Sequence, residues 1–482
     1  MFKKTKIVAT ISDVKCDVEF LKQIIDAGVN VIRLNTAHQS FEGTKKVIDN
    51  VRKVSEYIPL MLDTKGPEIR TNPSENQIHL KKGERIFVSG ENKPSDEKCI
   101  FVSYKNFYKD IPVKSKILID DGEIELEVIE KKNNKLLCIA KNEGTVKGRK
   151  SINVPDAKIN LPTLNSKDRE YIDFAIKNNL DFIAHSFVRN KKDLQEIQSL
   201  LDKNKSKIKI ISKIENQEGV DNIDDILENS YGIMVARGDL GIEISAEKIP
   251  SIQRMIIKKC IEKRKPVIVA TQMLHTMIKN PRPTRAEVSD VANAIYLGAD
   301  AIMLSGETAY GDYPLEAVKI MAKISREVEK NKEPIDESSI TSIHEEVPGF
   351  ITKSAVKASL LLPIKAIVAD TTTGRTARYL SAYRGKIPIF VLCYDKKVAR
   401  ELNLSYGVYT KYNQFEYNKK EMMKILIDPL LKEKLISKDN LVVLVVGNFG
   451  AICGTSTMEI STVDNLLNRR DKIETGSKPK HF

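Results

Sequence analysis

Short apolar runs alternate with longer amphipathic stretches along most of the chain. Eight runs rich in β-branched residues predict buried strands, at residues 6–11, 29–35, 59–65, 181–187, 207–214, 231–237, 266–271 and 300–305. The stretches between them have helical period, and several begin at a capping Asp, Ser or Thr and end at Gly or Asn, as in residues 17–28, 193–204 and 284–298. Eight alternating strand and helix units predict a parallel (β/α)8 TIM barrel, closed on itself.

One interval interrupts this alternation. More than a hundred residues separate the third predicted strand from the fourth, and within them residues 78–89, 116–144 and 150–155 have the pattern of short strands. The turn sequences DDG and KNN in this interval favour tight hairpins. We therefore expect an inserted all-β, barrel-like lid domain over residues 72–162, between the barrel segments 1–71 and 163–335.

A further domain is expected after the barrel. Residues 331–349 lose periodicity and gain acidic side chains, which is typical of a linker or an exposed loop. Apolar runs then return between helical stretches, at residues 366–370, 388–394, 407–412 and 441–447. They predict an open α/β sheet in a C-terminal regulatory domain over residues 345–475, followed by a frayed polar tail over residues 469–482.

Composition and charge narrow the function classes. The net charge of +13 could indicate nucleic acid or small anionic substrates, but the lysines are scattered among acids, so a solvated surface and a phosphate-bearing small molecule are favoured. The six cysteines have no metal-binding spacing and are expected to be reduced core thiols. We find neither an apolar leader nor a run long enough for a membrane span, and expect a cytoplasmic protein with no nucleic-acid or membrane partner.

Polar residues gather where the predicted barrel strands end. Active sites of such barrels lie at the carboxyl ends of the strands. The residues found at these ends are Arg33, Asn35, Asp63, Thr64, Lys65, Ser186, Lys213, Glu215, Arg237, Asp239, Thr271, Ser305 and Glu307. Burying Lys213 and Glu215 costs desolvation energy unless they pair with each other or bind something. So many polar strand ends together indicate a binding site.

The charges at this mouth have two interpretations. Glu215 and Asp239 follow adjacent strands and could share a hard cation such as Mg²⁺, or they could form a ring of salt bridges with Lys213 and Arg237. The positive charges outnumber two carboxylates and imply a multiply charged anion; they are Arg33, Lys65, Arg70 and Lys213. Gly238 and Gly241 could let backbone N–H groups approach a carboxylate or phosphate, or could simply form a tight turn.

Five long segments are distinctive: LDTKGPEIRT, SKIENQEG, MVARGDLGIEI, VATQMLHTMIKNPRPTRAEVSDVANA and MLSGETAYGDYP. They resemble the signature segments of pyruvate kinases. The resemblance covers nearly the whole chain in the family order of barrel, inserted β domain and α/β tail domain. It implies transfer of the phosphoryl group of phosphoenolpyruvate to ADP, giving pyruvate and ATP in the final step of glycolysis, with Mg²⁺ or Mn²⁺ and K⁺ as cofactors.

The same resemblance implies roles for residues at the mouth. Lys213 would stabilise the transferring phosphoryl group, Arg33 would grip it, and Glu215 and Asp239 would hold the divalent cation. The backbone at Gly238 and Asp239 would seat the substrate carboxylate. Thr271 and Ser305 match hydroxyls near the proton path to the enolate, and Thr271 is also expected to contact the substrate.

Nucleotide, potassium and effector sites are implied in the same way. The expected nucleotide contacts are Asn35, His38, Arg70 and Lys167, and the expected K⁺ ligands are Asn35, Asp63 and Thr64. Ala37 replaces a hydroxyl that would ligate K⁺, while Glu68 keeps the acidic residue associated with potassium dependence. A turn of the tail domain matches a sugar-phosphate effector site, or a nucleotide site, formed by Thr371, Thr372, Thr373 and Arg375. Its usual basic residue is replaced by Thr372, and the assembly is expected to be a homotetramer.

Two other functions are compatible with parts of the pattern. A barrel aldolase or lyase acting on pyruvate enolates would also use a Glu/Asp metal pair and an arginine, but would not need the inserted domain. A basic scaffold that binds RNA would not need Lys213, Glu215 and Asp239 together. Within the inserted domain, Asp121 either reaches the closed site or is an ordinary turn residue.

Overall fold

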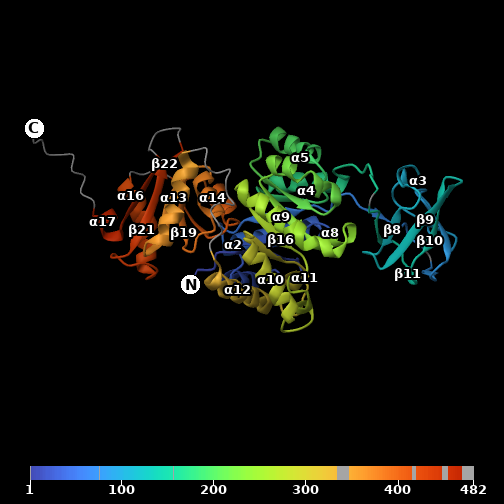
Figure 1. The fold of residues 1–482 in the computed structure, drawn as a ribbon, viewed down its shortest axis with the longest axis horizontal. Coiled ribbons are helices and arrows are strands. Elements are labelled where there is room, and N and C mark those ends of the chain that lie inside the picture. The colour runs from blue at the N-terminus through green and yellow to red at the C-terminus, as the bar shows by residue number, and fades with distance from the viewer. Residues whose placement is uncertain are drawn as a thin grey trace, which may run out of the picture.

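The protein is built from three bodies, a central barrel with a β module at one end and an α/β domain at the other (Figure 1). The computed structural model describes residues 2–74, 76–155, 157–333, 347–414, 419–447 and 454–468. The expected linker at 331–349 and the expected frayed tail at 469–482 lie largely or wholly outside these residues.

The central body is a closed barrel of eight parallel strands, which confirms the predicted fold. Its strands are β1 (Lys6–Thr10), β2 (Val31–Asn35), β3 (Leu60–Asp63), β13 (Phe182–His185), β14 (Lys209–Ile214), β15 (Gly232–Ala236), β16 (Val267–Ala270) and β17 (Ala301–Leu304). Side chains alternate in direction along a strand. Val8, Met61, Phe182 and Met303 belong to the cluster that fills the barrel interior, and their neighbours pack under the helices.

Helices cover the outside of the barrel. The longer ones are α1 (Val18–Ala27), α2 (Phe41–Val54), α4 (Ser166–Lys177), α5 (Lys191–Lys203), α7 (Ile223–Asn229), α9 (Ile249–Glu262), α10 (Arg285–Leu297) and α12 (Pro314–Asn331). The short ones are α6 (Gln217–Asp221), α8 (Arg237–Glu243), α11 (Gly306–Ala309) and the 3-10 turns Ala246–Lys248 and His275–Ile278.

The predicted caps hold with one exception. The Asp17 side chain accepts a hydrogen bond from the N–H of Phe20, and Thr284 forms a capping box with Glu287. The helix expected at 193–204 begins at Lys191 instead, because the side chain of Asn190 caps it. Asp193 pairs with Arg189 at 2.9 Å, so a local ion pair uses the residue that resembled a cap.

The inserted module is a seven-stranded sheet in the order β4-β12-β8-β9-β10-β6-β7, with a separate two-stranded sheet of β5 and β11. Its elements are β4 (Ile69–Arg70), β5 (Ile78–Leu80), β6 (Arg85–Ser89), β7 (Cys99–Phe101), α3 (Phe107–Asp110), β8 (Lys116–Ile119), β9 (Ile124–Lys132), β10 (Lys135–Ala140), β11 (Gly144–Val146) and β12 (Ser151–Asn153). Asn133 and Asn134 join β9 to β10 with φ values of 49° and 57°, as a two-residue hairpin turn requires.

The C-terminal domain is a five-stranded sheet in the order β20-β19-β18-β21-β22, with helices packed on it (Figure 1). Its elements are α13 (Val347–Leu361), β18 (Ile364–Thr371), α14 (Arg375–Ala382), β19 (Ile389–Cys393), α15 (Lys396–Leu402), β20 (Val408–Tyr412), α16 (Lys419–Lys432), β21 (Leu441–Gly447), β22 (Thr455–Thr462) and α17 (Val463–Leu467). The antiparallel edge strand β22 was not predicted, because TSTMEIST lacks the apolar run that marked the other strands.

The C-terminal domain contacts the amino ends of the barrel strands, opposite the predicted mouth. Asp181, just before β13, accepts a hydrogen bond from Arg400 Nε at 2.6 Å. Asp300, just before β17, pairs with Arg384 at 2.5 Å. The five described cysteines are free and buried, and within the described ranges no helix is long and apolar enough to cross a membrane.

Candidate active site

Lys213 is the centre of a buried cluster at the carboxyl end of β14. Its ammonium lies 2.7 Å from Ser186 Oγ, 3.0 Å from Asp63 Oδ1 and 2.9 Å from Glu215 Oε1, and the residue is 8% exposed. Burial alone would lower the pKa of Lys213, but the carboxylates of Asp63 and Glu215 outweigh it and raise the pKa well above the ordinary value. The side chain is therefore a permanent cation at the mouth.

Arg33 is held beside Lys213 by a shared carboxylate. Its Nε lies 2.6 Å from Asp63 Oδ2, and its Nη1 donates to Thr10 Oγ1 at 2.9 Å. Burial would raise the pKa of Asp63, yet the Arg33 and Lys213 cations reverse the shift and lower it. One ionised carboxylate at the end of β3 thus fixes two cations, one from the adjacent strand β2 and one from β14, two strands away.

Glu215 is the other acid of this cluster and is 1% exposed. Its Oε2 accepts the N–H of Phe187 at 2.6 Å, and Phe187 has a positive φ of 55°. Although Oε1 lies 2.9 Å from the Lys213 ammonium, no donor in the described chain reaches it along a hydrogen-bond direction. Burial and then Asp239 raise the pKa of Glu215 to about 7 against the opposing effect of Lys213. A cation at Oε1 would complete this carboxylate.

Asp239 lies in the first turn of α8, half-buried. Burial raises its pKa, and Glu215 and Asp239 each influence the pKa of the other, so the two carboxylates are close neighbours. Arg237 is turned away from them, since it pairs with Asp290 at 2.7 Å and donates to the Thr271 carbonyl oxygen at 2.7 Å. The alternative of a salt-bridge ring that includes Arg237 is therefore wrong, although the Lys213–Glu215 pair exists.

The acids fit a cation that keeps several ligands from solvent or substrate. No group of three or more His, Cys, Asp or Glu side chains with metal-binding geometry occurs in the described part of the chain. Two carboxylates with one unsatisfied buried oxygen nevertheless suit Mg²⁺ or Mn²⁺, because Mg²⁺ is usually bound through one or two carboxylates plus water and phosphate oxygens.

Thr271 and Gly238 contact each other at the ends of β16 and β15. The Thr271 hydroxyl accepts the N–H of Gly238 at 2.8 Å and donates to the Ala270 carbonyl oxygen at 2.6 Å. The Gly238 amide expected to seat a carboxylate is therefore already engaged with a side chain. Thr271 and the following Gln272 both have positive φ, at 68° and 57°, so this corner holds a strained backbone. A Cβ at Gly241 would meet nothing within 4 Å, so no close approach requires a glycine there.

Ser305 ends β17 with a buried hydroxyl that has no hydrogen-bond partner among the described residues. Its backbone N–H donates to Glu307 Oε2 at 2.7 Å, and Glu307 Oε1 accepts the N–H of Leu274. Glu307 thus links the segments that follow β17 and β16. The unsatisfied Ser305 hydroxyl is available for a ligand.

The residues expected to contact nucleotide lie on several elements of the barrel and the inserted module. Lys167 donates to the Thr36 carbonyl oxygen at 2.9 Å, which brings α4 to the loop after β2. Arg70 pairs with Glu68 and donates to the Arg149 carbonyl oxygen at 2.7 Å. His38 is exposed. Lys65 also lies at this edge, with its N–H bound to Asp168 Oδ1 at 3.0 Å.

The expected potassium ligands are already hydrogen bonded. Asn35 Oδ1 accepts the N–H of Ala37 at 3.2 Å, the Thr64 carbonyl oxygen accepts the Ser186 hydroxyl at 2.6 Å, and Asp63 binds the two cations. Each of these oxygens has further lone pairs, but Ala37 has no hydroxyl to offer. These oxygens can therefore still coordinate K⁺, but the set lacks the hydroxyl ligand that Ala37 replaces.

Two buried residues of the site were not predicted. His185 lies beside Thr64 with its Nδ1 at 3.4 Å from Oγ1, and burial lowers the pKa of His185 to about 4. Asp168 is fully buried and holds the Lys65 backbone, and its Oδ2 has no partner among the described residues. The local sequence gave no signal for either residue. Asp168, for example, resembles an ordinary residue of a first helical turn.

The β module faces the mouth through its DDG turn. The Asp121 carboxylate accepts the Ser151 hydroxyl at 2.7 Å, and Asp121 also contributes to the raised pKa of Asp239. Asn153 donates to Glu243 Oε1 of α8 at 2.9 Å. Asp121 is therefore a turn residue that also lies within electrostatic range of the acids.

The expected effector residues lie at one turn of the C-terminal domain, between β18 and α14. The Thr371 hydroxyl accepts the N–H of Gly374 at 2.9 Å, and Gly374 has a φ of 80°. Thr372, Thr373 and Arg375 are exposed, and Arg375 Nε donates to the Tyr379 hydroxyl at 3.1 Å. The structure brings the four residues together around an exposed turn.

Comparisons with known proteins agree over nearly the whole chain. Residues 2–318 match the family described as pyruvate kinase, barrel domain, and residues 350–461 match pyruvate kinase, alpha/beta domain. A pyruvate kinase of Borreliella burgdorferi is 50% identical over 97% of this chain and 99% of its own length. One of Geobacillus stearothermophilus is 43% identical over 98% and 82%. The crystal structure of a pyruvate kinase from Cryptosporidium parvum superposes with a TM-score of 0.90 at 38% identity, covering 96% of each chain.

Proposed function

Because the chain belongs to the pyruvate kinase family, and so transfers the phosphoryl group of phosphoenolpyruvate to ADP, we propose a division of this task among the residues at the mouth of its barrel. The observation that carries the proposal is the buried cluster of Lys213, Arg33, Asp63 and Glu215. Family membership decides against the aldolase or lyase hypothesis and against the RNA scaffold.

Lys213 and Arg33 bind the phosphoryl group. Two cations fixed 3.0 Å and 2.6 Å from one carboxylate cannot reorient freely, so they are preorganised for the negative charge on the phosphoryl oxygens. Phosphoryl transfer requires little covalent chemistry from a protein, and charge stabilisation with positioning accounts for most of the catalysis. Lys213 contacts the carboxylates of both Asp63 and Glu215, and it is the principal catalytic cation.

Glu215 and Asp239 hold the divalent cation, Mg²⁺ or Mn²⁺. When bound, the cation supplies further positive charge to the substrate oxygens. The protein contributes the buried carboxylate of Glu215 and the neighbouring carboxylate of Asp239, whose pKa values are raised by burial, and a positively charged ligand would offset that burial.

The substrate carboxylate and the proton path lie on the adjoining strand ends. The first turn of α8, at Gly238 and Asp239, seats the carboxylate, and Gly238 exchanges its bond to Thr271 for a bond to the substrate. That exchange frees the Thr271 hydroxyl beside the bound molecule. Thr271 and the unpartnered Ser305 hydroxyl deliver the proton to the enolate.

ADP binds between the barrel mouth and the β module. Asn35, His38, Arg70 and Lys167 form its contacts, and the module over residues 72–162 closes on it as a lid. The barrel segments 1–71 and 163–335 carry the catalysis, and residues 345–475 carry regulation through a sugar phosphate or nucleotide at Thr371–Thr373 and Arg375. We also propose that the protein is a homotetramer and that it is located in the cytoplasm.

Turnover of phosphoenolpyruvate and ADP with Mg²⁺ tests the central role of Lys213. In Lys213→Met we expect kcat to fall at least roughly 10³-fold, because one fixed cation is lost from the phosphoryl site. The control is Lys209→Met, at the other end of the same strand, which should keep turnover within a few-fold. Melting curves establish that both variants fold, and near-native turnover in folded Lys213→Met would remove Lys213 from the mechanism.

A further inference from the structure

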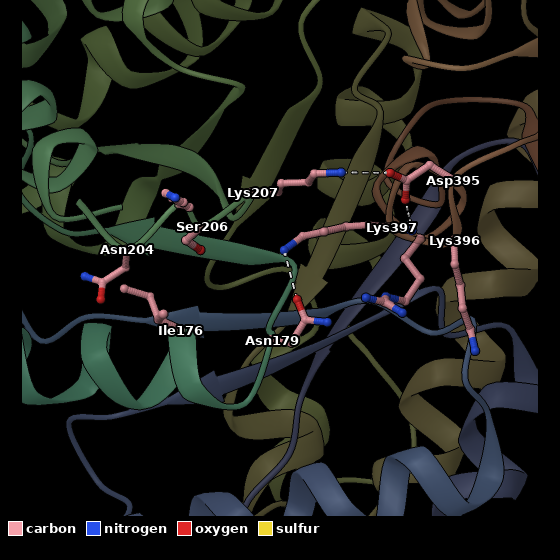
Figure 2. A pocket seen from close by; sticks show the side chains of 10 residues that line it. Ile176, Asn179, Asn204, Ser206, Lys207, Asp395, Lys396 and Lys397 are labelled. Carbon is pink, nitrogen blue, oxygen red and sulfur yellow. Dashed lines mark hydrogen bonds and ion pairs between the residues drawn. The ribbon is translucent and has the colours of Figure 1, made fainter. Parts of the chain in front are cut away.

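A second charged site lies at the opposite end of the barrel, where a cleft of about 490 Å³ separates the barrel from the C-terminal domain. The barrel wall is formed by the segments after α4 and α5, and the domain wall by the start of α15 (Figure 2). Its charged lining consists of Lys205, Lys207, Asp395, Lys396, Lys397 and Arg400. None of these residues takes part in the catalytic mouth or in the turn at Thr371–Thr373.

The cleft carries an excess of positive charge, since five of these six side chains are cationic. Asp395 is already used, because it pairs with Lys207 at 3.2 Å and accepts the backbone N–H of Lys397 at 2.7 Å (Figure 2). Two carboxylates outside the lining contact Lys396 and Arg400, namely Glu56 and Asp181. Lys205 and Lys397 have no carboxylate within ion-pair distance anywhere in the described ranges.

Lys397 shows the excess of positive charge most clearly, because neither of its hydrogen-bond partners is a carboxylate. It is 8% exposed, and its ammonium donates to the Leu180 carbonyl oxygen at 3.1 Å and to Asn179 Oδ1 at 3.3 Å, which are both neutral (Figure 2). Burying an ammonium without a counter-ion is costly. In agreement, burial lowers the pKa of Lys397, and the more distant carboxylates of Asp181 and Glu401 offset only part of this shift. An anion in the cleft would offset this cost.

Arg400 adds a geometric preference to the charge. Its Nε donates to Asp181 Oδ1 at 2.6 Å, which fixes the guanidinium at the cleft wall. Guanidinium and ammonium groups together are the donors that bind phosphate oxygens most strongly in proteins. The volume is within the range of pockets that hold small organic molecules.

We infer that this interdomain cleft binds a small phosphate-bearing anion, which joins Lys205 and Lys207 of the barrel to Lys396, Lys397 and Arg400 of the C-terminal domain. The inference does not depend on the proposed catalytic roles, because the cleft lies at the amino ends of the strands. Binding there stabilises the contact between the two bodies, and turnover in the absence of the anion does not require it.

Calorimetric titration of the full chain with inorganic pyrophosphate in magnesium-free buffer tests the inference. The cleft variant is Lys205→Asn/Lys207→Gln/Lys396→Gln, in which Asn suits the φ of 51° at position 205. The matched control is Lys45→Gln/Lys258→Gln/Lys330→Gln, which removes three exposed lysines that each pair with a carboxylate on their own helix. Both variants keep Arg33 and Lys213, so pyrophosphate binding at the mouth is the same in each.

We expect wild type and control to bind one more pyrophosphate than the cleft variant, or to bind it at least roughly tenfold more tightly. Pyrophosphate should also raise the melting temperature of wild type and control more than that of the cleft variant. Sugar phosphate and nucleoside monophosphate titrations then separate the two sources of such an anion. Identical titrations of cleft variant and wild type would overturn the inference, as would an equal loss in both triple variants.

Discussion

Asp63 sets the geometry of the catalytic mouth with two oxygens. One binds the Arg33 guanidinium and the other the Lys213 ammonium, at 2.6 Å and 3.0 Å. Both cations belong to strands that neighbour or lie near β3, so a single buried carboxylate positions charges delivered by distant parts of the chain. In the proposed mechanism Asp63 acts by positioning these two cations and does not itself touch the phosphoryl group.

The potassium response is predicted to depend on residue 37. Ala37 leaves the set of Asn35, Asp63 and Thr64 without a hydroxyl ligand, so we expect K⁺ to activate weakly. In Ala37→Ser the half-activating K⁺ concentration should fall several-fold, since one ligand is restored. Rates in KCl and in a bulky organic cation measure the response, with Ala37→Gly as the control. Equal rates in both salts for the wild type would contradict any role for K⁺.

Lys332 is predicted to make stability depend on pH. It is buried with its ammonium on the Ile295 carbonyl oxygen at 2.7 Å, and burial, followed by Arg384, lowers the pKa of Lys332 to about 7. In the unfolded chain this amine keeps its proton up to about pH 10.4. Below pH 7 the folded state must hold the proton as well, which lowers the free energy of unfolding, and this loss diminishes as pH rises from about 7 to about 10.

Removing the amine should therefore stabilise the protein at low pH. In Lys332→Met we expect the free energy of unfolding to rise by as much as a few kcal/mol at pH 6, and to change less at pH 9.5. Denaturant titrations at the two pH values measure the difference, with Lys330→Met as the exposed control. An effect of the same size at both pH values would show that Lys332 stays charged in the folded state over this pH range, with no lowered pKa.

Residues of the site were predictable where the strand pattern placed them and not where a neighbour decided their role. Lys213, Glu215 and Asp63 end buried runs, so their convergence followed from the barrel. The pairing of Arg237 with Asp290 on α10 could not be foreseen, because the sequence separates them by more than fifty residues. Asp168 and His185 escaped notice for the same reason, since tertiary neighbours bury them.

Elements were predictable to the extent that their faces are buried. The barrel strands have apolar residues on both faces, and their predicted bounds lie within two residues of those in the structure. Strand β7 is apolar but only three residues long, and β22 lies at a sheet edge and lacks that pattern. The start of α5 was misplaced because Asn190 and Asp193 are both possible caps and only tertiary contacts distinguish them.

The β9–β10 hairpin offers a test at the scale of an element. Asn134 has a φ of 57°, a conformation that Gly adopts without strain and Ala resists. We expect Asn134→Ala to destabilise the hairpin by about 1 kcal/mol and Asn134→Gly to be neutral or slightly stabilising. Hydrogen exchange of peptides that cover β9 and β10 measures the change. Equal protection in the two variants would show that the turn does not limit opening.

At the scale of the whole molecule, buried ion pairs join the C-terminal domain to the barrel. Arg384 is 3% exposed and binds Asp300 at 2.5 Å, and Asp300 also accepts the backbone N–H groups of Val267 and Tyr406. One carboxylate therefore links a barrel strand to the domain packed beneath it.

Breaking this pair on one side should be more harmful than breaking both sides. Arg384→Met leaves Asp300 buried without its cation, and we expect a loss of about 3–5 kcal/mol in the free energy of unfolding. Arg384→Met/Asp300→Asn should recover part of that loss, because the second change removes the stranded charge. Denaturant unfolding of wild type, Arg384→Met, Asp300→Asn and the double variant measures the coupling, and a double variant as unstable as the sum of the two single variants would argue that the pair does not interact.

The path of the chain around the β module has a last consequence. The module leaves the barrel after β3 and returns before β13, and these strands are hydrogen-bonded neighbours. The eight-stranded barrel therefore closes without any strand from the inserted module. A short turn could replace the module with no change in the order of the barrel strands. The module can therefore be exchanged for the corresponding module of another barrel with the same strand order.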